Sequence, residues 1–167
     1  TINASHSSDF SDISFESDKH GLFLSTHDGC VYYDPSWVQL GDDIDGAAAY
    51  DRSRYVSLSS DGTIVAIGAP RHGTSDEGHV KVYKYISGIW SQLGSDIDGI
   101  SGDQCGTSVS LSSDGTIVAI GSPYNNDNGN DSGHVRVYQY SGGGSWSQLG
   151  SDIQGAATND ESGYSIS

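Results

Sequence analysis

Apolar and small polar residues alternate along this chain in short runs bounded by turn residues. In residues 56–59, Val and Leu alternate with Ser, which places the two apolar side chains on one face of a strand. Residues 63–67 form a largely apolar run, typical of a strand buried on both faces. Residues 78–85 alternate again, and a segment with Trp and Leu follows at 90–93. The pattern predicts four short strands, with a tight hairpin at Asp61-Gly62 between the first two.

The same four-strand pattern recurs along the chain. Residues 56–68 return residue for residue as 109–121, and 78–85 return with two substitutions as 133–140. A Trp-x-Gln-Leu-Gly segment begins at Trp37, Trp90 and Trp146. A period of about 50 residues with four strands in each copy is typical of β-propeller blades.

We therefore predict an all-β fold of tandem four-stranded antiparallel blades, β-propeller-like, with three units and the first strand of a fourth. The first unit is a degenerate copy whose strands are expected near residues 13–15, 22–24 and 29–33. The expected boundaries are 1–46, 47–99, 100–155 and 156–167, the last being a further first strand or an exchanged terminal strand.

Composition narrows the possible partners. The chain has 167 residues, with 22 Asp and Glu against 7 Lys and Arg, so its formal net charge is −15. A surface this acidic repels phosphate, which argues against nucleic acid as a partner. No apolar run has the length of a membrane helix, so no membrane insertion is expected. Ten Tyr, three Trp and three Phe favour a folded chain over a disordered one.

Several of the repeated segments resemble FG-GAP repeats, the blades of integrin-α-type β-propellers. Residues 67–70 and 120–123 match the family's Val-Gly-Ala-Pro segment, and 105–109 is similar to its Phe-Gly-x-Ser-Val opening. Residues 78–80 and 133–135 are similar to its Gly-x-Val third strand. The resemblance implies an extracellular or cell-surface protein with an adhesive or scaffold role.

The chain departs from that family where the family binds calcium. The family often joins its first and second strands through an Asp-x-Asp/Asn-x-Asp-Gly loop, whereas here the joints are Ser59–Gly62 and Ser112–Gly115. A single carboxylate cannot supply the oxygens that Ca²⁺ requires. The resemblance therefore does not carry over its metal, and no cofactor is expected from it.

A different loop is a candidate for calcium. Residues 123–132 are rich in Asn, Asp and Gly, and Asp127, Asn128 and Asp131 could supply oxygen ligands, although exposed turns have the same composition. The segments at 43–46 and 96–99 pair carboxylates with Gly and could gain a ligand from Asp51 or Asp103, but a plain turn is favoured there.

Four further positions carry weaker signals. Asn3 and Asn130 lie in glycosylation sequons, which mark exposed asparagines in secreted chains. Cys30 and Cys105 could form a disulfide if the array curled or met another copy, or could be two buried thiols.

His79 and His134 occupy equivalent strand positions, which favours a shared packing or hydrogen-bonding role over metal ligation. The chain has no Gly-x-Ser-x-Gly elbow, no phosphate loop and no Cys-x-x-Cys pair. We expect no enzymatic activity.

The number of blades suggests the function. Closed propellers need about four to eight blades, so three leave apolar faces and strand edges uncovered. The expected assembly segment is the terminal strand, Gly163, Tyr164, Ser165, Ile166 and Ser167. We expect a non-enzymatic extracellular structural protein that joins copies of itself head to tail into a fibre or repeat array. The alternative is an adhesion segment of a larger surface protein that binds a carbohydrate or a protein.

Overall fold

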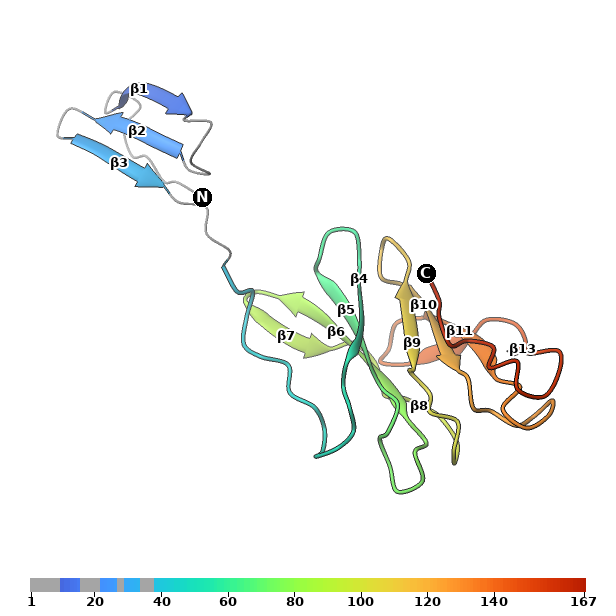
Figure 1. Cartoon of the computed structure of the whole chain (residues 1–167). Helices are drawn as coiled ribbons and strands as arrows, with labels where there is room; N and C mark the ends of the chain where they lie inside the picture. Colours follow the sequence, from blue (N-terminus) through green and yellow to red (C-terminus); the bar gives the residue numbers. More distant parts are fainter. Residues whose placement is uncertain (1–9, 16–21, 27–28, 34–37) are drawn as a thin grey trace. The chain divides into compact units, whose positions relative to one another are not determined.

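The computed structural model describes residues 10–15, 22–26, 29–33 and 38–167, and the chain divides into two compact units, Thr1–Gln39 and Leu40–Ser167. All the regular structure in the described residues is β-strand, which confirms the predicted class (Figure 1). The predicted boundaries at 46, 99 and 155 stay predictions, because the compact units do not separate one blade from the next.

The first unit contains a three-stranded antiparallel sheet. Its strands are β1 (Phe10–Phe15), β2 (Leu22–Thr26) and β3 (Gly29–Tyr33), in the order β1-β2-β3. They coincide with the three strands expected in the degenerate copy. Residues 38–46, which copy the Trp-Leu strand of the later repeats, form no strand.

The second blade comprises β4 (Tyr55–Leu58), β5 (Ile64–Ala69), β6 (His79–Ile86), β7 (Ile89–Gln92) and β8 (Ile97–Asp98). The third blade repeats it as β9 (Ser108–Leu111), β10 (Ile117–Ser122), β11 (His134–Tyr140), β12 (Trp146–Gln148) and β13 (Ile153–Gln154). Each blade is an antiparallel sheet with its strands in sequence order.

The fourth strand of each blade is interrupted, which corrects one prediction. We expected a turn at residues 96–99, but Ile97–Asp98 forms β8, which pairs with the beginning of β6 while β7 pairs with its end. The two short strands therefore share one edge of β6. Their backbone groups need partners as the rest of the sheet does, and the free edge of β6 supplies them.

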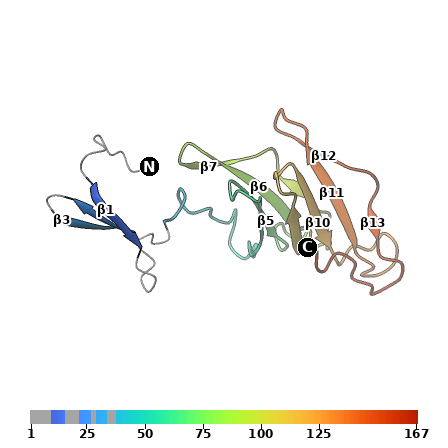
Figure 2. The same ribbon diagram turned by 90° about the horizontal axis from the view of Figure 1, so that it is seen from above.

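The hydrophobic core lies between the second and third blades, whose sheets face each other (Figure 2). Alternate residues of the central strands meet there because successive side chains of a strand point to opposite faces. The buried members of this core are Ile64, Ala66, Val80, Val82, Ile97, Cys105, Val109, Val118 and Ile120.

Glycine allows each blade and the segment that follows it to approach at backbone distance. A Cβ on Gly68 would collide with the carbonyl oxygen of Gly106, and a Cβ on Gly121 would collide with that of Gly163. The same close approach thus occurs twice, at equivalent repeat positions. It explains why the fifth residue of the second strand, β5 or β10, is Gly in both copies.

The Asp-Gly hairpins are held by the aspartate side chain. Asp61 Oδ1 accepts hydrogen bonds from Ser59 Oγ (2.7 Å), from the Thr63 amide (3.0 Å) and from Thr63 Oγ1 (2.9 Å), and Gly62 has φ +69°. Asp114 makes the same contacts in the third blade. These bonds lower the pKa of Asp61 to about 2.

The expected first strand of a fourth unit is not present as a strand. Residues 165–167 have no ladder partner, whereas β4 and β9 each pair with the second strand of their own blade.

We predict that Gly68→Ala destabilises the protein by about 3 kcal/mol, because the added methyl group forces the two backbones apart. Gly142→Ala is the control: a Cβ there meets no atom within 4 Å, although its backbone, unlike that of Gly68, has a left-handed φ of +81°. It should cost about 1 kcal/mol. Urea unfolding measures both, and equal losses would contradict the backbone-contact explanation.

We predict that the two Asp-Gly hairpins weaken in acid. Because folding depresses the Asp61 pKa from 3.8 to about 2, its stabilisation is complete above about pH 4 and is lost as the pH falls toward 2. Unfolding curves between pH 5 and 2 should show this loss, and the double variant Asp61→Asn, Asp114→Asn should lose less stability over the same range. An unchanged pH dependence in that variant would argue against it.

Candidate assembly interface

A tryptophan from each blade binds the fourth-strand region that precedes it. Trp146 donates from Nε1 to the carbonyl oxygen of Leu93 (2.8 Å), and Trp90 donates to that of Leu40 (2.6 Å). The Trp146 ring covers Gly94, where a Cβ would lie 2.8 Å from the ring. The contact is one bond repeated at equivalent positions of successive units.

A second contact is made by the segment that leads from one blade to the next, which we call the interblade strap. It spans residues 99–106 after the second blade and 155–163 after the third. Each strap runs along the loop that precedes the third strand of the blade it leaves, and forms a parallel bridge there, Gly78 with Cys105 and Gly133 with Ser162. The matching backbone bonds are Gly99 N to Gly78 O, Cys105 N to Glu77 O, Gly155 N to Gly133 O and Ser162 N to Ser132 O.

The second strap makes the same backbone bonds to its loop as the first. Gly163, the last residue of that strap, accepts a hydrogen bond from Ser108 Oγ at its carbonyl oxygen (2.6 Å). Of the five residues predicted for assembly, Gly163 is therefore part of the strap. Tyr164, Ser165 and Ile166 instead line a groove.

That groove lies beside the first strands of the blades. Its volume is about 370 Å³, and it is lined by Arg54, Tyr55, Val56, Thr107, Ser108, Val109, Tyr164, Ser165 and Ile166. These residues come from three equivalent places, the start of β4, the start of β9 and the chain after the second strap. The groove thus follows the edge where successive first strands come together.

The far face of the third blade carries the same apolar residues that form the core in the second blade, but here they are more exposed. Ile97 of the second blade is 5 % exposed, whereas its counterpart Ile153 in the third blade is 59 % exposed. Val80 and Val82 are fully buried, but the equivalent Val135 and Val137 are only half-buried. Equal residues at equal positions differ in burial because β9–β13 cover the second blade, whereas no sheet within Leu40–Ser167 covers the far face of the third.

The first residues of β6 and β11, His79 and His134, each belong to a polar cluster. The sequence presents its members separately and does not predict that they meet. His79 Nδ1 is 4.0 Å from Asp96 Oδ2, and His134 Nδ1 is 3.9 Å from Asp152 Oδ2. Both imidazoles are buried and neither Nδ1 has a hydrogen-bond partner. Burial lowers the pKa of both histidines, so each is neutral at neutral pH. The recurrence of the His-Asp pair in both repeats was the available signal.

The three predicted calcium ligands each have different neighbours in the structure. Asp127 has His134 and Asp152 within ligand-sharing distance, rather than only its loop neighbours. Asn128 donates from Nδ2 to the Gly155 carbonyl (2.7 Å), and Asp131 accepts from Asn130 Nδ2 (2.9 Å). The loop thus fastens to the second strap, and calcium binding by Asp127, Asn128 and Asp131 stays a prediction.

The two aspartates considered as extra ligands have structural partners instead. Asp51 lies 2.9 Å from His72 Nδ1, and Asp103 accepts from Asn125 Nδ2 at 3.0 Å. Both carboxylates are buried. They fasten the start of each blade to the loop that precedes its third strand.

Cys105 is a free thiol in the interblade core, and its disulfide with Cys30 stays a prediction. Burial raises the pKa of the Cys105 thiol to about 12, which makes it unreactive. Asn130 is exposed, as a glycosylated asparagine must be. Asn3 and the Cys30 side chain lie outside the described residues.

The described residues include no helix of the length and apolarity that a membrane span requires. No curated protein resembles the chain closely enough to match it. Residues 95–138 match a known family, described as the FG-GAP repeat. This match runs from the end of the second blade through β11, and 109–121 within it are identical to 56–68. Residues 95–138 thus form an FG-GAP-like repeat, as the motifs predicted.

Proposed function

We propose that this chain is a non-enzymatic, extracellular structural protein whose third blade stacks on a second copy of the same chain, head to tail. The observation that supports this most directly is the half-buried face of β10 and β11, whose counterpart on β5 and β6 is fully buried. Burying an apolar side chain contributes about 1.5–3 kcal/mol, so several such residues favour association.

A blade of the same kind is the occupant that fits this face. In the second blade, Val80, Val82 and Ile97 are covered by residues of the third blade that include Val118 and Ile120. A further copy offers equivalent side chains, because its blades repeat the same sequence. The Leu149 carbonyl is then equivalent to the carbonyls of Leu40 and Leu93. Each of those two accepts a hydrogen bond from the tryptophan of the following blade.

The contact is heterologous, since the two sides of a blade carry different residues. A heterologous contact repeats without limit unless its rotation closes a ring, so copies joined in this way form a fibre or an array. The strap at 155–163 supports the arrangement, because it already makes the bonds that 99–106 makes where a blade does follow.

A second function is supported by the FG-GAP match and by the groove beside the first strands. In this alternative, the chain is an adhesion segment of a surface protein and binds a carbohydrate or a protein ligand there. A glycan array with the monomeric protein tests it: selective binding that is lost in Tyr164→Ala supports recognition, and absence of binding argues against it.

We predict that the protein self-associates with increasing concentration and that Ile153→Lys weakens this association at least tenfold. Ile153 is already exposed, so the charged side chain leaves the fold intact but must be desolvated on stacking. Sedimentation velocity measures the association. Ser141→Lys is the control for the added charge, because Ser141 is an exposed residue of the β11–β12 loop. A monomer at all concentrations, or equal weakening by both variants, would contradict the proposal.

A further inference from the structure

We propose that the second blade binds one divalent transition-metal ion, such as Zn²⁺, through His79, Asp96 and Asp98, and that the equivalent place in the third blade does not bind one. The three residues each offer one ligand atom, and these atoms all lie within 4.8 Å of one another. Ligand atoms around a tetrahedral Zn²⁺ are roughly 3.4 Å apart, so small side-chain rotations complete the site.

The sheet brings the three ligands together. His79 is directly opposite Asp98 in the β6–β8 pair, and directly opposite residues place their side chains on the same face. Asp96 lies two residues before Asp98, immediately ahead of β8. The interruption between β7 and β8 is therefore what positions both carboxylates beside the imidazole.

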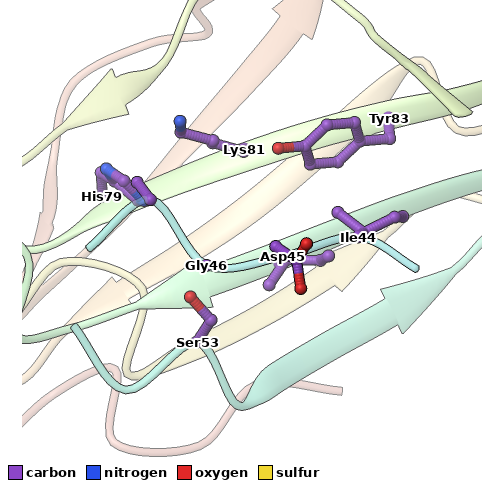
Figure 3. A pocket seen from close by; sticks show the side chains of 9 residues that line it. Ile44, Asp45, Gly46, Ser53, His79, Lys81 and Tyr83 are labelled. Atoms are coloured by element: carbon purple, nitrogen blue, oxygen red, sulfur yellow. The ribbon is translucent and has the colours of Figure 1, made fainter. Parts of the chain in front are cut away.

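The imidazole itself points to a missing ligand. The His79 side chain is 2 % exposed, and its Nδ1 has no hydrogen-bond partner in the structure. A buried polar atom without a partner normally binds a water molecule or an ion. A cavity of about 20 Å³ adjoins His79 and Lys81 and has the room for one such particle, but its other lining residues include Asp45 and not Asp96 or Asp98 (Figure 3).

In the third blade, an arginine side chain takes the place that we propose for the metal ion. There, Arg136 donates to Asp152 Oδ2 from both Nε (3.0 Å) and Nη2 (2.7 Å), so a cation of the chain itself already neutralises the carboxylate. Gln154 stands where Asp98 stands in the second blade. The third blade thus has one fewer strand carboxylate and a firmly bound guanidinium.

The second blade holds its internal cation less firmly. Lys81 occupies the position of Arg136, but its Nζ is 3.5 Å from Asp96 Oδ2, too far for a strong charge-assisted bond. The cluster then holds two carboxylates and one imidazole nitrogen without a hydrogen-bond partner. A divalent ion satisfies all three groups, and the nitrogen ligand favours Zn²⁺ over Ca²⁺, which prefers oxygen alone.

Isothermal titration of the full chain with ZnCl₂ tests the proposal, using variants that copy one blade into the other. Asp98→Gln introduces the residue found at 154, and Lys81→Arg introduces the residue found at 136. Both side chains already occur in this fold, so circular dichroism should stay unchanged. Each variant should weaken zinc binding at least tenfold, the first by removing a ligand and the second by placing a guanidinium on Asp96.

Asp127→Asn is the matched control, because it removes the exposed carboxylate of the third blade's cluster and should leave the affinity within twofold. Excess CaCl₂ should not displace the zinc. Absence of zinc binding would overturn the proposal. So would zinc binding of unchanged affinity in Asp98→Gln and Lys81→Arg, which would place the ion at other histidines.

Discussion

The architecture depends on backbone-to-backbone contact between each blade and the strap that leaves it. Gly68 lies against the Gly106 carbonyl and Gly121 against the Gly163 carbonyl, at distances that no side chain permits. Because the sheets meet this closely, Val80, Val82 and Ile120 are removed from water and the strap can bridge to the loop beside it. A pair of small residues in each repeat therefore determines how one blade stacks on the next.

Near-identical repeats also make the chain its own comparison. The second blade shows each residue with a neighbour in place, and the third shows its counterpart without one. The contrast between Ile97 and Ile153 identifies an uncovered face, and the contrast between Lys81 and Arg136 distinguishes a cluster with a firmly bound cation from one without. Both inferences rest on differences between copies rather than on any single residue.

The strand pattern was predictable because its causes are local. Alternation in β4 and β9, the apolar run of β5 and β10, and the Asp-Gly hairpins all depend on neighbouring residues. The break between β7 and β8 was not predicted, because the composition of residues 96–99 is typical of a turn. These residues form a strand only because the free edge of β6 offers them hydrogen-bond partners. The His79 cluster was missed for a similar reason: it depends on cross-strand register, which the spacing of His79 and Asp98 in the sequence does not reveal. Gly163 was expected to begin a strand, but it ends the second strap. The sequence did not reveal this, because the contacts of Gly163 are with the preceding blade.

The central claim is that the far face of the third blade is completed by another copy of the chain. Hydrogen–deuterium exchange as a function of protein concentration tests it within one sample series. The account predicts that amides in β11 to β13 become more protected as concentration rises, while those of β6 to β8, already covered, stay constant. Exchange in β11 to β13 that does not depend on concentration would contradict it.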